Sequence, residues 1–165
     1  MKPRSLGALV ALAILAIDQA SKFWVLSGLK MEAYQKIAVT PFLDFELLWN
    51  PGISFSLFPQ GTATGRWILL ALTLAATALL CLWLWRVNSK LAGIALGAIV
   101  GGALGNGYDR FAYNAVVDFL GFHAFGFHWY VFNVADTAIT LGVVLLLYDN
   151  LLADRRAPAR SGGRG

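Results

Sequence analysis

The chain has 165 residues, of which 58% are hydrophobic and only 13% are charged, and its formal net charge at pH 7 is +4. With a mean hydropathy of +0.65 it is far too apolar for an ordinary soluble domain, so the composition indicates an integral membrane protein. The basic residues lie at the ends of apolar runs, where membrane topology places them, so nucleic-acid binding is not expected; the single cysteine, Cys81, excludes an internal disulfide and a cysteine-based metal site.

Four apolar stretches are long enough to cross a hydrocarbon core, which needs about 20 residues of helix. They cover residues 6–26, 67–85, 91–108 and 129–148. The first resembles a secretory signal peptide, but no small-residue cleavage site follows it and polar residues continue the helix, so we interpret it as a retained span. We expect residues 1–154 to form one integral membrane domain and residues 155–165 to be a disordered cytoplasmic tail.

The basic residues at the ends of these stretches predict the orientation of the chain. They occur before the first stretch, in the turn between the second and third, and after the fourth: Lys2, Arg4, Arg86, Lys90, Arg155, Arg156, Arg160 and Arg164. The positive-inside rule therefore places both termini in the cytoplasm. The two long connections, residues 28–66 and 109–128, then lie on the outer side.

The first outer connection carries the alternating pattern of β-strands. Apolar side chains alternate with others over residues 43–49 and over residues 53–57, and Asn50-Pro51-Gly52 between them suits a turn. We predict a small β-hairpin here, to which residues 116–119 and 122–127 add strand. The expected fold is thus an α-helical integral membrane protein, a four-helix bundle with a small extracytoplasmic β-sheet.

Within the third span, glycine recurs at every fourth position, at Gly93, Gly97, Gly101 and Gly105. This small-xxx-small pattern lets helix backbones approach one another closely. It predicts close packing against a neighbouring helix.

Polar side chains interrupt the apolar spans at one depth. At a rise of 1.5 Å per residue, each falls in the outer part of its span or in the second outer connection. Ionised groups at a helix centre cost roughly 2.5 to 3.5 kcal/mol on insertion scales, so their convergence indicates a function. The residues concerned are Asp18, Lys22, Asn106, Asp109, Asp118, Asn133 and Asp136.

Asp118 and Asp136 have no basic residue nearby in sequence, and paired acids that share one proton are a known hydrolytic device. They are the candidate reactive centre. Asn133, Asp136, Thr137 and Thr140 fall on one face of the fourth span, which should point into the bundle.

Two other pairs of polar residues are less clear candidates for chemistry. For Asp18 and Lys22, four residues apart, an internal ion pair and a contact with substrate are equally favoured. His123 and His128 lack the spacing of a metal-binding helix and suit interfacial or hydrogen-bonding roles. No G-x-S-x-G motif supports a nucleophilic serine.

Five ordered blocks of this sequence resemble the signature blocks of the lipoprotein signal peptidases, also called signal peptidase II. The resemblance implies a four-helix aspartyl peptidase of the bacterial inner membrane. Such an enzyme removes the signal peptide from diacylglyceryl-modified prolipoproteins, just before the lipidated cysteine. The blocks are Asp18–Lys22 (DQASK), Asn50–Phe55 (NPGISF), Gly101–Arg110 (GGALGNGYDR), Val116–Phe119 (VVDF) and Phe132–Asp136 (FNVAD).

The resemblance also implies roles for individual residues. Asp118 and Asp136 match the catalytic pair of the family, and Lys22 closes the first block. The sequence departs from the family pattern at Trp49, where a basic residue is common, and at Ser54, where alanine is common. These departures bear on loop contacts with substrate and not on the chemistry. Six further residues match positions that line or support the site: Asp18, Asn50, Asn106, Asp109, Arg110 and Asn133.

In the expected mechanism one ionised aspartate takes a proton from water while the other, protonated, polarises the scissile carbonyl. The pair titrates as a unit, so the proton is not assigned to either. No metal or cofactor is expected, and the partners are the lipid-modified substrate and membrane lipids, with the enzyme a monomer. Two rival classes remain: an ion-coupled transporter, and a metal-dependent lipid enzyme that chelators would inhibit.

Overall fold

In the computed structural model, which describes residues 1–52 and 63–156, four long helices carry a four-stranded antiparallel sheet. All four helices are long and apolar enough to cross a membrane, which confirms the predicted fold class. The helices are α1 (Pro3–Phe23), α2 (Ala63–Arg86), α3 (Lys90–Tyr113) and α4 (Val134–Arg156), and a π-helical turn (Trp24–Gly28) extends α1. The strands are β1 (Lys36–Thr40), β2 (Leu43–Asn50), β3 (Val116–Ala124) and β4 (Phe127–His128).

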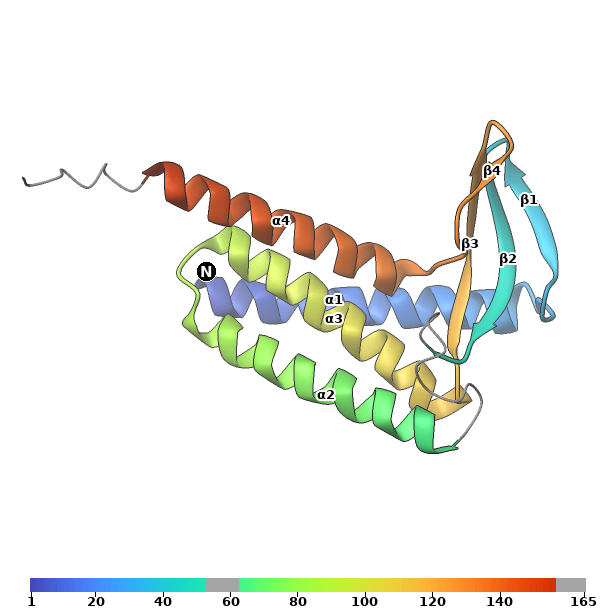
Figure 1. Cartoon of the computed structure of the whole chain (residues 1–165), viewed down its shortest axis with the longest axis horizontal. Coiled ribbons are helices and arrows are strands. Elements are labelled where there is room, and N and C mark those ends of the chain that lie inside the picture. The colour runs from blue at the N-terminus through green and yellow to red at the C-terminus, as the bar shows by residue number, and fades with distance from the viewer. Residues whose placement is uncertain (53–62, 157–165) are drawn as a thin grey trace, which may run out of the picture.

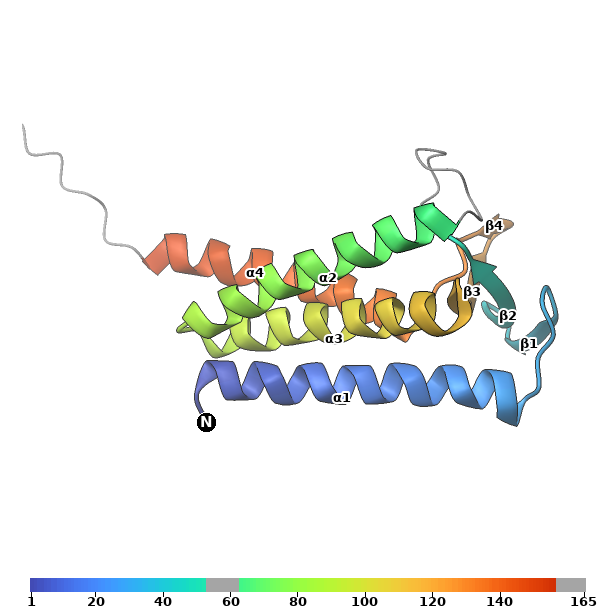
Figure 2. The ribbon, with the colours of Figure 1, turned by 90° about the horizontal axis from the view of Figure 1, so that it is seen from below.

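The sheet stands across one end of the bundle, where α1 and α3 finish and α2 and α4 begin (Figure 1). The N-terminus lies at the other end, beside the turn that joins α2 to α3 (Figure 2). Helix α3 packs against the three other helices, and most of its span is buried, whereas theirs is mostly exposed. The bundle is therefore built around α3, and the remaining helices present apolar faces suited to lipid.

Glycines of α3 bring α1 into backbone contact. A Cβ atom added at Gly93 would lie 2.5 Å from the carbonyl oxygen of Pro3, and one at Gly101 would lie 2.5 Å from that of Ala11. At Gly97 an added Cβ would overlap the carbonyl oxygen of Gly7. The prediction of close packing is confirmed, and α1 is the partner helix.

The sheet corrects the predicted hairpin. Strand β2 forms as expected, but its two neighbours are β1, which precedes it, and β3. Residues 53–57, the expected partner, lie outside the described residues. Sequence alternation missed β1 because it is a short strand with mostly exposed side chains. Residues 116–119 and 122–127 do join the sheet, mainly as the single strand β3.

Helix α4 begins at Val134, five residues after the start expected for the fourth span. The preceding segment runs beside β3 instead: Trp129 donates its backbone N–H to Phe122 O at 2.8 Å, and Phe132 bridges to Leu120. Asn133 therefore lies just before the helix and not on its face, which corrects the predicted stripe. Its side chain accepts a hydrogen bond from the N–H of Asp136 at 2.9 Å, so it acts as the helix cap.

Close packing between α1 and α3 can be tested with two glycines of the same helix. We expect Gly97→Ala to lower the thermal midpoint in detergent by several degrees, because overpacking costs about 1 to 3 kcal/mol. Gly107→Ala is the matched control, since its added Cβ would meet Thr73 Cγ2 at an ordinary 3.6 Å. Equal midpoints for the two variants would contradict the backbone contact.

Candidate active site

The polar residues predicted from sequence meet at the sheet end of the bundle, around Lys22. Its Nζ lies 2.8 Å from Asp18 Oδ2 and 2.7 Å from Asp109 Oδ2. All three side chains are at most 2% exposed. Of the two alternatives for Asp18 and Lys22, the structure shows the ion pair, with Asp109 as a second partner. Such charges are tolerated in an apolar interior only when they are paired.

This buried triad also holds the two segments that carry the candidate reactive carboxylates. Asp18 Oδ1 accepts the backbone N–H of Ala135 at 2.9 Å, in the first turn of α4 and one residue before Asp136. Asp109 Oδ2 accepts the N–H of Val117 at 3.1 Å, one residue before Asp118. Lys22 thus links Asp18 and Asp109, whose carboxylates hold the backbone next to Asp136 and Asp118.

Asp136 is oriented by a reciprocal cap at the start of α4. The Asn133 side chain accepts the Asp136 N–H, and Asp136 Oδ2 accepts the backbone N–H of Asn133 at 3.3 Å, the arrangement of a capping box. Asn106 Nδ2 donates to the other oxygen, Asp136 Oδ1, at 2.7 Å. The first turn of a helix is also where a negative charge is favoured by the helix dipole. Both carboxylate oxygens therefore have fixed directions.

Asp118 lies on β3, where its side chain accepts hydrogen bonds from two asparagines. Asn133 Nδ2 donates to Asp118 Oδ1 at 2.7 Å, and Asn50 Nδ2 donates to Asp118 Oδ2 at 3.0 Å. Asn133 thus bonds to Asp118 through its amide and to Asp136 through its backbone. The structure brings the two aspartates together on either side of this one residue.

The surroundings of Asp118 favour its protonated form. Burial, with the side chain only 3% exposed, raises the pKa of the carboxyl to about 6, and the charge of Asp136 acts in the same direction. Hydrogen bonds from Asn50 and Asn133 oppose this rise but do not cancel it. Below pH of about 6, Asp118 can hold a proton beside Asp136.

Asn106 and Arg110 complete the connections among the predicted residues. Asn106 Oδ1 accepts from Lys22 Nζ and from Asn133 Nδ2, each at 3.1 Å. Arg110 Nη1 donates to the Asn106 carbonyl at 3.2 Å, while its buried Nε has no hydrogen-bond partner among the residues that the structure describes. The guanidinium charge lies within electrostatic reach of Asp118 and Asp136. Arg110 therefore places a positive charge near both aspartates.

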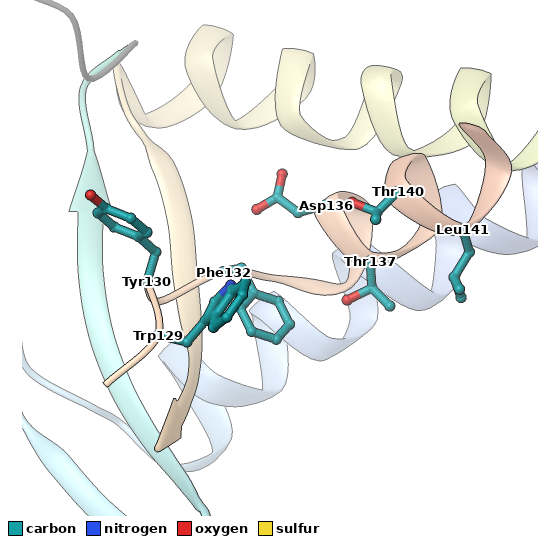
Figure 3. Close-up of a pocket in the computed structure, with 7 residues that line it drawn as sticks. All are labelled: Trp129, Tyr130, Phe132, Asp136, Thr137, Thr140 and Leu141. Atoms are coloured by element: carbon teal, nitrogen blue, oxygen red, sulfur yellow. The ribbon is translucent and has the colours of Figure 1, made fainter. Parts of the chain in front are cut away.

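A hollow of about 320 Å³ opens beside Asp136. Figure 3 shows Asp136 at the start of α4, between aromatic side chains that precede the helix and residues along its first two turns. The lining residues are Trp129, Tyr130, Phe132, Asp136, Thr137, Thr140 and Leu141. The wall is mostly apolar, with the carboxylate as its ionisable group. The hollow is suited to an apolar chain that presents one polar bond to Asp136.

Sequence reasoning missed Gln19 as a site residue. Its Nε2 lies 3.0 Å from Asp109 Oδ1 and 3.1 Å from Asp18 Oδ2, so it braces the triad from α1. A polar residue next to Asp18 in an apolar span was the available signal. The aromatic wall, Trp129 to Phe132, was hidden because these residues were assigned to a helical span.

Comparison with known proteins gives a consistent result. The sequence model of the family described as signal peptidase (SPase) II matches residues 10–152. The chain is 55% identical over 165 residues to the lipoprotein signal peptidase of Methylocella silvestris, covering 100% of this chain and 96% of that one. It is 52% identical over 149 residues to that of Beijerinckia indica, with 90% and 89% covered.

Two solved bacterial membrane enzymes have similar structures. One, determined by the in meso method at 2.3 Å resolution, matches with a TM-score of 0.73 and 26% identity over 96% of this chain and 94% of the other. The second, at 1.9 Å resolution, gives a TM-score of 0.77 and 25% identity over 88% and 92%. Both likenesses extend over nearly the whole bundle and sheet.

The buried triad predicts a large effect of removing its cation. We expect Lys22→Met to destabilise the protein by about 3 to 5 kcal/mol, because Asp18 and Asp109 would be left buried without a positive partner. Thermal unfolding in detergent measures the effect, and Lys30→Met, at an exposed position after α1, is the control. Equal unfolding midpoints for the two variants would show that the triad does not stabilise the protein.

Proposed function

The chain belongs to the signal peptidase II family, and on that premise we propose that Asp118 and Asp136 cleave the signal peptide from diacylglyceryl-modified bacterial prolipoproteins, just before the lipidated cysteine. Members of this family are aspartic-type peptidases acting on lipoproteins. Membership favours the aspartyl pair over the transporter and the metal-dependent lipid enzyme considered from sequence. The observation that carries the proposal is the hydrogen bonding of Asn133 to both carboxylates.

Asp136 is the base in the proposed reaction. Its charge is favoured at the helix N-terminus, and Asn106 and Asn133 hold both of its oxygens in place. It takes a proton from a water molecule held between the carboxylates, and the water oxygen attacks the carbonyl carbon of the scissile peptide bond.

Asp118 is the acid in this scheme. Burial raises its pKa to about 6, so the protonated form, which predominates below that pH, donates a hydrogen bond to the scissile carbonyl oxygen as negative charge develops there. When the tetrahedral intermediate collapses, the carbon–nitrogen bond breaks and the proton held by Asp136 passes to the departing nitrogen. The new carboxyl group remains on the signal peptide, and each aspartate returns to its starting state.

The supporting residues act on the two carboxylates. Asn50 and Asn133 fix the direction of the Asp118 carboxyl, and Asn106 fixes that of Asp136. The Arg110 guanidinium supplies positive charge near both carboxylates. This function requires no metal or cofactor.

The chain is a multi-pass membrane protein. We place it in the bacterial inner membrane as a monomer, with residues 1–154 as one membrane domain and residues 155–165 as a cytoplasmic tail. The basic residues of the N-terminus and of the α2–α3 turn lie at the end of the bundle opposite the sheet, which supports cytoplasmic termini and a periplasmic site (Figure 1). A signal peptide crossing the membrane would present its outer end to the dyad.

Replacing either aspartate tests the dyad. We expect Asp118→Asn and Asp136→Asn each to lower cleavage of a synthetic lipidated precursor by at least about 100-fold, because one proton-transfer group is lost. Asp149→Asn is the matched control, since Asp149 lies near the other end of α4, where it accepts a hydrogen bond from Ser89. Wild-type cleavage by either dyad variant, measured by mass spectrometry of the products, would refute the assignment.

The pH dependence of cleavage tests which aspartate is the acid. A raised pKa means that Asp118 is protonated below about 6 and ionised above it, so kcat/KM should fall as pH rises through about 6. Asn50→Ala removes a hydrogen bond that favours the ionised form, so the fall should move to higher pH. A shift to lower pH, or a flat profile from about pH 5 to 8, would contradict the role of Asp118.

A further inference from the structure

A second, polar hollow of about 360 Å³ lies over the sheet. We name it the sheet pocket and define it by six of its lining residues. It is lined by ionisable side chains from all four strands, together with Tyr130, which follows β4 and also lines the hollow beside Asp136. The proposed chemistry uses none of them. These residues are Lys36, Asp44, Glu46, His123, His128 and Tyr130.

Within the sheet pocket, Asp44 is already fully paired. Lys36 Nζ lies 2.8 Å and His123 Nε2 2.9 Å from the same oxygen, Asp44 Oδ2. The hydrogen bond from Lys36 holds the pKa of the Asp44 carboxyl below its ordinary value, so Asp44 stays charged. Its side chain is buried beneath these partners, and it acts as a fixed part of the pocket floor.

Glu46 is the carboxylate that remains available to a ligand. Its Oε2 lies 3.8 Å from Lys36 Nζ, beyond hydrogen-bond distance, and its side chain is 31% exposed. Lys36 Nζ lies 2.8 Å from Asp44 and 3.8 Å from Glu46, so the Glu46 carboxylate is the negative group left facing a ligand. A cationic side chain entering it would be attracted, and an anionic one repelled.

The sheet pocket and the hollow beside Asp136 share part of their lining. Trp129 and Tyr130 line both the sheet pocket and the hollow beside Asp136. On the other side, Leu48 lines the sheet pocket and is the cross-strand partner of Asp118 in the register of β2 and β3. Asp136 therefore lines an apolar hollow that adjoins the polar sheet pocket through Trp129 and Tyr130.

A prolipoprotein has the same polarity on either side of its cleaved bond. Its apolar signal segment would lie along α4, against Thr137, Thr140 and Leu141, which line the hollow beside Asp136 (Figure 3). Its mature segment, which leaves the membrane, would then cross the aromatic pair onto the sheet. We infer that the sheet pocket is the subsite for residues that follow the lipidated cysteine, and that Glu46 makes it favour cationic over anionic side chains.

This inference rests on the proposed function, and matched substrates separate the two. Three lipidated precursor peptides would differ only at the second residue after the lipidated cysteine, which is Lys, Gln or Glu. With the purified full chain at low salt, we expect kcat/KM for the Lys peptide to exceed that for the Glu peptide by about two- to five-fold, the range for a solvent-exposed charge pair. The uncharged Gln peptide measures the cleavage rate without a charge at this position.

Glu46→Gln should bring the ratio close to one while cleavage of the Gln peptide stays at the wild-type rate. Glu32→Gln is the matched control, because Glu32 is the only other glutamate of the sequence and lies at an exposed position outside the sheet pocket; it should retain the wild-type ratio. A wild-type ratio of one, or an unchanged ratio in Glu46→Gln, would overturn the subsite. Failure to cleave even the Gln peptide would instead contradict the proposed function.

Discussion

The buried contact of Lys22 with two aspartates is the interaction on which the rest of the structure depends. Asp18 Oδ2 and Asp109 Oδ2 both bind Lys22. Asp18 Oδ1 also accepts the N–H of Ala135, and Asp109 Oδ2 that of Val117, each one residue before an aspartate of the proposed dyad. Paired in this way, the charges can remain in an apolar bundle, whereas any one of them alone would be costly. These contacts join α1, α3, α4 and β3, so the interactions that hold the bundle together also position the proposed dyad.

Glycine makes that arrangement sterically possible. A Cβ atom at Gly105 would overlap the Asp18 carboxylate, and one at Gly102 would lie 2.5 Å from the carbonyl oxygen of Ala135. Helices α1 and α4 can therefore press their polar residues against α3 only where α3 has no side chain. The stripe that packs the span at Gly93 and Gly97 thus continues, at the sheet end of the bundle, into the wall of the candidate active site.

The regular geometry of helices was enough to predict which site residues on α1 and α3 lie at the same depth. A rise of 1.5 Å per residue places Asp18, Asn106 and Asp109 at one depth, and the structure joins them around Lys22. It failed where contacts between distant segments decide the conformation. Asn133 leaves the helix because its side chain caps Asp136, and β1 pairs with β2 although its exposed pattern carries little signal. The roles of backbone N–H groups, which have no sequence signature, could be found only in three dimensions.

The proposed dyad requires that the negative charge of Asp136 raises the pKa of the Asp118 carboxyl. Carbon-13 NMR of aspartate side-chain carboxyls, recorded against pH in detergent for the wild type and for Asp136→Asn, measures this directly. The account predicts that Asp118 titrates near pH 6 in the wild type and at lower pH in Asp136→Asn, because a neighbouring negative charge has been removed. Titration of Asp118 at its ordinary value of 3.8, or at the same pH in both proteins, would contradict it.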